Sequence, residues 1–80
     1  MTSLRTLDSL TTGERAIIRT LEVSEDLAYC LSAFGFRIGK TVQLIRRARF
    51  AGPLHIRIDT TDLMLRACDA RCIEVQRQPA

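Results

Sequence analysis

The chain has 80 residues, of which 46% are hydrophobic and 26% are charged, a composition typical of a folded globular protein. No apolar run approaches the roughly 20 residues that span a bilayer, and the first residues lack the apolar block and cleavage site of a secretion signal. We therefore expect one cytoplasmic domain over residues 1–80, with its core between about residues 7 and 76. The net charge of +3, carried almost entirely by arginine, favours an acidic partner.

The N-terminal part predicts one strand after a short lead-in. Leu4, Leu7 and Leu10 precede a turn at Gly13, and we interpret them as an apolar lead-in to that turn. From there to Glu22, apolar residues fall at both odd and even positions. A strand in this stretch would be partly buried on both faces.

A helix of about ten residues is predicted after the first strand. Ser24 is suited to its N-cap, and Glu25 and Asp26 suit the positive end of the helix dipole. Gly35 is expected to end the helix in the left-handed conformation, with Phe36 folding back on the last turn. The apolar face expected to pack on the sheet consists of Leu27, Cys30, Leu31 and Phe34.

The segment 41–58 predicts a β-hairpin with one apolar face and one charged face. Residues 51–53 supply the reversal between its arms, and Ile45 and Arg46 interrupt the alternation of the first arm, which predicts a β-bulge there. The positions assigned to the apolar face are Val42, Leu44, Ala48, Phe50, Leu54, Ile56 and Ile58. Because one hairpin cannot bury its own apolar face, other elements must cover it.

The C-terminal part predicts two further strands. A turn at 59–61 leads into a strand over 63–66, a single helical turn is expected at 67–71, and a last strand follows over 73–75. The whole pattern is about five short strands, with one short α-helix between the first and the second. We therefore expect a mainly β protein, folded as a small barrel or sandwich.

Residues suited to catalysis or metal binding are few. The lone histidine, His55, is interpreted as a solvated surface residue, because the sequence places no nucleophile beside it. Cys68 and Cys72 have the spacing of metal ligands on a helical turn, with Asp69 and His55 as candidates for further ligands, but a structural zinc site needs four. We therefore predict a non-enzymatic protein without a cofactor and interpret these cysteines, with Cys30, as small buried side chains. Weak Fe²⁺ or Zn²⁺ binding is the alternative.

Four arginines of the hairpin, Arg46, Arg47, Arg49 and Arg57, are the candidate partner-binding residues. Some of them should share the charged outer face, and the bulge leaves open which; there they would attract an acidic protein surface or a phosphate group. A solvated face that protects a sheet edge from aggregation explains the same charges equally well. Nucleic-acid binding is not expected, because the few aromatic residues leave little for bases to stack on.

The glycine turns and apolar positions keep one order and spacing from Leu7 to Val75. They centre on the step Phe34-Gly35-Phe36. The others are Leu10, Gly13, Glu14, Ala16, Ile17, Leu27, Leu31, Gly39, Val42, Ala48, Pro53, Leu54, Ile56, Ile58, Leu63, Leu65, Arg66, Asp69, Ala70 and Ile73. In this order and spacing the chain resembles the FeoA family, small accessory proteins of bacterial ferrous-iron uptake, which usually have a Leu-Gly-Leu type of step at the central position.

The resemblance implies an SH3-like β-barrel carrying one helix. It also implies a partner, FeoB, the membrane permease for Fe²⁺ with an attached GTP-binding domain. On this expectation the chain binds and regulates the permease and reaches the membrane only through it. The alternative is a metal-binding or metal-sensing domain, because the same barrel resembles the C-terminal domain of iron-dependent repressors. An exposed barrel edge is also compatible with a homodimer.

Overall fold

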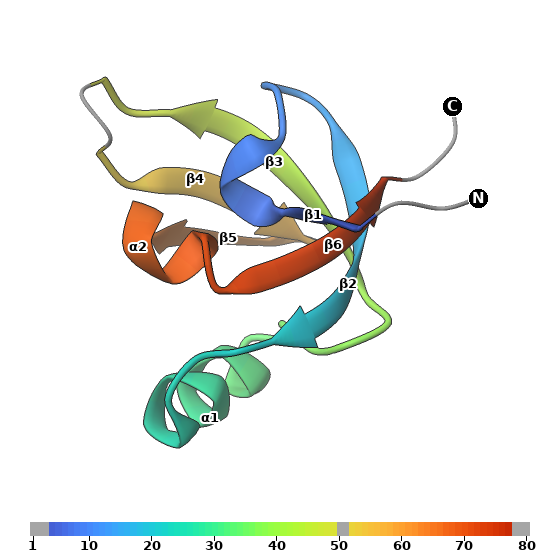
Figure 1. Ribbon diagram of the computed structural model, residues 1–80, viewed down its shortest axis with the longest axis vertical. Coiled ribbons are helices and arrows are strands. Elements are labelled where there is room, and N and C mark those ends of the chain that lie inside the picture. Colours follow the sequence, from blue (N-terminus) through green and yellow to red (C-terminus); the bar gives the residue numbers. More distant parts are fainter. Residues whose placement is uncertain (1–3, 50–51, 78–80) are drawn as a thin grey trace.

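The computed structural model describes residues 4–49 and 52–77, and therefore leaves Phe50 and Ala51 of the predicted hairpin outside the described part. The described residues form a small antiparallel barrel with one projecting helix (Figure 1). The strands are β1 (Leu4–Thr6), β2 (Arg15–Leu21), β3 (Thr41–Arg47), β4 (Leu54–Ile58), β5 (Thr61–Leu65) and β6 (Ile73–Arg77). The helices are the 3-10 helix η1 (Leu7–Ser9), α1 (Glu25–Ala33) and α2 (Ala67–Ala70). The predicted mainly β fold class is confirmed.

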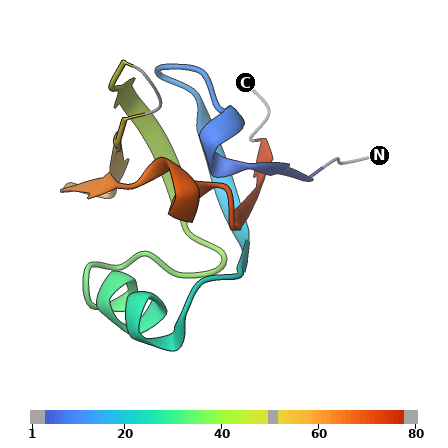
Figure 2. The same ribbon diagram turned by 60° about the vertical axis from the view of Figure 1, so that its left-hand side comes forward.

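The strands lie in the order β1-β6-β2-β3-β4-β5, and all neighbouring pairs are antiparallel. Strand β6, which comes last in the sequence, is therefore inserted between β1 and β2. Helix α1 connects β2 to β3, and Figures 1 and 2 both show it standing off one end of the barrel.

Strand β1 raises the number of strands above the five that the sequence indicated. It covers three residues, too few to display an alternating pattern, and it is held by pairing with residues 74–76 of β6. The helix η1 follows at once and buries Leu7 completely, and Leu10 behind it is 1% exposed. The apolar lead-in is thus part of the barrel.

A β-bulge in β3 decides which side chains of the hairpin face the core. Before the bulge, Val42 and Leu44 pair with Ile58 and Ile56, and all four are fully buried. The register then shifts between Leu44 and Arg46, where the sequence predicted a bulge. That prediction is confirmed.

Beyond the bulge, the sides of the strand are exchanged. Arg47 lies opposite the buried Leu54 and so takes the inner side, whereas Arg46 lies opposite His55 on the outer side. Ala48 was assigned to the apolar face and is instead exposed. The assignment is wrong because the extra residue of the bulge reverses the alternation from that point on.

Helix α1 begins and ends as its sequence predicts. The Ser24 hydroxyl accepts a hydrogen bond of 3.2 Å from the backbone of the first turn. Gly35 has φ = +88°, and the amides of Gly35 and Phe36 donate to the carbonyls of Ser32 and Leu31. These two bonds form a Schellman ending, which returns the chain to the barrel with Phe36 fully buried.

Only part of the predicted apolar face of α1 reaches the core. Leu31 is buried and Leu27 is partly buried, but Cys30 is exposed and Phe34 is 53% exposed. The prediction is wrong for the last two because α1 stands off the barrel end, so that one edge of the helix meets the strands (Figure 2).

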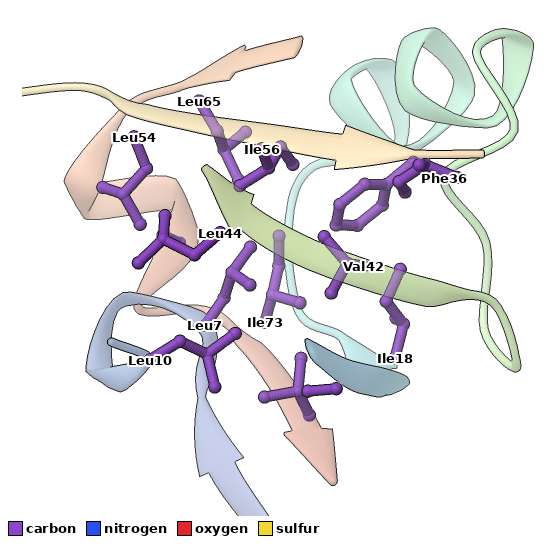
Figure 3. Close-up of a cluster of buried hydrophobic side chains, with 14 of the residues drawn as sticks. Leu7, Leu10, Ile18, Phe36, Val42, Leu44, Leu54, Ile56, Leu65 and Ile73 are labelled. Atoms are coloured by element: carbon purple, nitrogen blue, oxygen red, sulfur yellow. The ribbon is translucent and has the colours of Figure 1, made fainter. Parts of the chain in front are cut away.

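The core is a single cluster formed by the strands together with residues of η1, α1 and α2 (Figure 3). Within the described residues every buried side chain is apolar, and each large one contributes about 1.5–3 kcal/mol relative to leaving it exposed. The cluster contains Leu7, Leu10, Ala16, Ile18, Leu31, Phe36, Val42, Leu44, Leu54, Ile56, Ile58, Leu65, Ala70, Ile73 and Val75. Over the same part of the chain, none of the helices has the length and apolar character needed to cross a membrane.

Candidate partner-binding surface

The outer face of β3, β4 and β5 carries two rows of side chains that face one another across the strands. Written from β3 to β5, the first row is Gln43, Arg57 and Asp62, and the second row is Arg46, His55 and Met64. Of the candidate arginines, Arg57 lies in the first row and Arg46 in the second, whereas Arg47 and Arg49 belong to neither.

In the first row, Arg57 is committed to an ion pair. Its Nε lies 2.7 Å from Oδ1 of Asp62 and its Nη2 lies 3.3 Å from Oδ2. The hydrogen bond from Arg57 is the main reason that the pKa of Asp62 is lowered. Both side chains are nearly half exposed, so the pair stabilises the fold little, but the charge of Arg57 is matched.

His55 lies in the second row and is more covered than the sequence suggested. Its side chain is 25% exposed, because β3 and β5 flank it on both sides. Its Nε2 lies 3.3 Å from Oδ2 of Asp62, without the geometry of a hydrogen bond. The predicted position on the outer face is found, but the side chain is only partly exposed to solvent.

Arg47, which the bulge turns to the inner side, connects the hairpin to the N-terminal part of the chain. Its guanidinium donates to the carbonyl of Leu10 at 2.7 Å and to the carbonyl of Asp8. These carbonyls lie at the end of η1, so the contact fixes η1 against β3. We interpret Arg47 as a structural brace.

Of the four candidate arginines, Arg46 and Arg49 are the two whose charge is unmatched within the described residues. Among residues 4–49 and 52–77, neither side chain forms an ion pair or donates a hydrogen bond. Both border a hollow of ≈ 460 Å³ at the end of the hairpin, which we call the hairpin hollow. Its lining residues are Arg46, Arg47, Ala48, Arg49, Pro53, His55 and Met64, and none of these is acidic.

Met64 is a surface residue that the sequence analysis did not single out. It is 64% exposed at the rim of the hairpin hollow. Its position between Leu63 and Leu65 could have identified it from the sequence. Side chains alternate along a strand, so a residue between two leucines that face inward must point to the outer face.

The three cysteines are exposed, so the prediction of buried cysteines is wrong. In the single turn of α2, the inward positions are taken by Ala67 and Ala70 instead. The Cys72 thiol lies 3.5 Å from the carbonyl oxygen of Cys68, to which it donates. His55 belongs to β4, and within the described residues no three potential metal ligands come together.

Comparison with known proteins decides the family. A family model described as FeoA domain matches residues 5–77. A Campylobacter jejuni protein named for its role as Fe(2+) transport protein A is 33% identical over 70 residues, which cover 88% of this chain and 95% of that protein. The chain belongs to the FeoA family. The resemblance inferred from glycine turns and apolar spacing is confirmed.

Solved structures show how closely the FeoA fold is kept. A FeoA protein from Chlorobium tepidum matches with a TM-score of 0.89 at 21% identity, over 94% of this chain and 71% of that one. A manganese-dependent transcriptional repressor matches with a TM-score of 0.85 at 18% identity, over 98% of this chain and 44% of the repressor. At these identities the likeness concerns the fold alone, and the expected SH3-like barrel is confirmed.

Proposed function

We propose that this FeoA-family chain is a non-enzymatic accessory protein of ferrous-iron uptake that acts in the cytoplasm by binding and regulating a FeoB-type permease. The observation that carries the proposal is the family match over residues 5–77. The relative from C. jejuni, named for Fe(2+) transport, supports the same pathway. A rigid barrel with an unmatched basic surface suits a binding module.

Arg46 and Arg49 are the docking residues that we favour among the four arginines. Arg57 is already matched by Asp62, and Arg47 is engaged with the carbonyls of η1. A partner would have to break those contacts to use them, whereas the other two guanidinium groups are available. Exposed charges of this kind steer association and select an acidic surface more than they add affinity.

The test is co-purification of the chain with the permease after solubilisation in detergent. The double variant Arg46→Gln, Arg49→Gln removes the proposed docking charges. The matched control is Arg37→Gln, Arg71→Gln, because both residues are exposed, lie outside the hairpin and remove the same net charge. Retention of wild type and control with loss of the hairpin variant supports the proposal, and retention of the hairpin variant contradicts the docking residues.

Regulation needs a separate measurement. GTP hydrolysis by the permease is measured with and without a saturating amount of the chain. A change in turnover that the hairpin variant fails to produce supports regulation through this surface. Unchanged turnover with the wild-type chain leaves binding but removes regulation.

A metal-binding domain is the second candidate function. It is favoured by the likeness of the fold to a manganese-dependent repressor and by the exposure of Cys68 and Cys72. Equilibrium dialysis of the reduced chain against Fe²⁺ or Zn²⁺ tests it, with Cys68→Ser, Cys72→Ser as control. Equal retention by both proteins eliminates the cysteine pair as the site.

A further inference from the structure

We propose that the hairpin hollow binds the phosphate groups of anionic phospholipids, so that the chain contacts the membrane surface directly. This goes beyond the proposed function, in which the membrane is reached through the permease, and it does not depend on the permease. The hollow is formed by side chains of β3, of β4, of their connection and of β5.

The first argument is the charge of the hollow. Arg46, Arg47 and Arg49 line it, and no acidic residue does so among the described residues. The Arg47 guanidinium donates to the carbonyls of Asp8 and Leu10, so the free guanidinium groups at the hollow are those of Arg46 and Arg49. The acid beside it, Asp62, is held by Arg57 through contacts of 2.7 and 3.3 Å. The positive charge of the hollow is therefore not cancelled from within the described chain. Planar guanidinium groups with free donors are well suited to the oxygen atoms of a phosphate.

The second argument is the pairing across the strands. Arg46 lies directly opposite His55, which is a base, in a position where an opposite charge would stabilise the sheet. Asp62 lies 3.3 Å from Nε2 of His55 but is hydrogen-bonded by Arg57, so Arg46 has no acidic partner of its own among the described residues, and an anionic ligand in the hollow would supply one. The neighbouring row shows the alternative, since there Arg57 faces Asp62.

The third argument favours a lipid over phosphate in solution. Met64 is 64% exposed at the rim, and Pro53 and Ala48 are exposed beside the arginines. An apolar rim next to basic side chains is the pattern of surfaces that lie at a membrane interface. Figure 1 shows the ends of β3 and β4 at the opposite side of the barrel from α1, so a flat surface can approach them without meeting the helix.

The experiment is co-sedimentation of the full chain with vesicles at low ionic strength. One set of vesicles contains equal parts of phosphatidylglycerol and phosphatidylcholine, and the other contains phosphatidylcholine alone. A basic residue near an anionic surface contributes about fivefold to partitioning, so Arg46→Gln, Arg49→Gln should lower binding to the anionic vesicles by about 30-fold. Arg47 is left intact because it braces η1.

Matched variants separate the hollow from general attraction. Arg37→Gln, Arg71→Gln removes the same charge elsewhere and should leave binding within about threefold of wild type. Met64→Ser should weaken binding to the anionic vesicles without changing net charge. Thermal melts of each variant establish that it is folded.

Three results would overturn the proposal. If the wild-type chain stays in solution with both kinds of vesicle, it does not bind lipid. Equal losses in the hairpin variant and the Arg37, Arg71 variant show attraction by net charge alone. Release of the chain by inorganic phosphate, at a sodium chloride-matched ionic strength, shows a site for free phosphate in place of a lipid. Because the vesicles contain no protein, failure here leaves the proposed permease partner untouched.

Discussion

The neighbouring residues Arg46 and Arg47 should behave in opposite ways when each is replaced by alanine. Arg47→Ala removes two hydrogen bonds that hold η1 against β3, those to the carbonyls of Asp8 and Leu10. Arg46→Ala removes an exposed side chain that makes no side-chain hydrogen bond or ion pair within the described residues. We expect the first variant to be destabilised and the second to be nearly unchanged.

The size of the difference follows from the contacts. A hydrogen bond from a charged donor contributes roughly 1.5–3 kcal/mol when it is buried, and about 1 kcal/mol is reasonable for each of these partly exposed bonds. The loss for Arg47→Ala is then about 2 kcal/mol, and in a domain of this size it lowers the Tm by about 8–16 °C. For Arg46→Ala we expect a change within about 0.5 kcal/mol.

Thermal and urea unfolding of both variants under one condition provide the assay. Backbone amide exchange in residues 7–10 should rise in Arg47→Ala, because η1 loses its contact with β3. Similar Tm values for the two variants would refute the assignment of the two arginines to opposite sides of the strand.

Three further outcomes are expected. The backbone hydrogen bond from Thr11, with the charges of Arg77 and Arg5, lowers the pKa of Glu14 in the folded chain. Glu14 therefore stabilises the fold at pH values above its ordinary pKa of 4.5, and this contribution is lost as the pH falls through the lower pKa of the folded state. Glu14→Gln should therefore show a smaller loss of stability than wild type on acidification, and equal losses in a urea titration would contradict this. Gly35→Ala should lower the free energy of unfolding by about 1 kcal/mol, because the backbone at this position has φ = +88°. The new Cβ would lie 4.0 Å from the nearest side-chain atom and so adds no clash. A loss above about 3 kcal/mol would mean that the turn itself is disrupted. Cys72→Ser, at an exposed site, should change the free energy of unfolding by less than about 0.5 kcal/mol, and labelling of the wild-type thiol by iodoacetamide under native conditions checks its exposure.

Local signals in the sequence were sufficient for the elements whose pattern is local. The N-cap at Ser24, the Schellman ending at Gly35 and the bulge near Ile45 all depend on residues a few positions apart, and each is found in the structure. The same holds for the alternation of Leu54, Ile56 and Ile58, which are all buried. In such cases the periodicity of apolar residues and the residues found at turns are sufficient to predict the element.

What the sequence could not supply depends on distant parts of the chain. Strand β1 exists because β6 pairs with it, and three residues carry no period of their own. The exposure of Cys30 follows from where α1 sits relative to the barrel, which its amphipathic pattern does not specify. For the candidate site, the sequence located the arginines but could not divide them, because the inner position of Arg47 and the ion pair of Arg57 both depend on cross-strand register.

The insertion of β6 between β1 and β2 has a consequence for the order of folding. On the ribosome, β1 and β2 emerge long before residues 73–77, so β1 has no partner strand until β6 is made, and β2 has β3 alone. The hairpin of β3, β4 and β5 has no such delay, since its partners follow one another directly. We therefore expect the nascent chain to acquire the β3–β5 meander first and to complete the barrel only after β6 is released, a pairing of high sequence separation that should limit the folding rate.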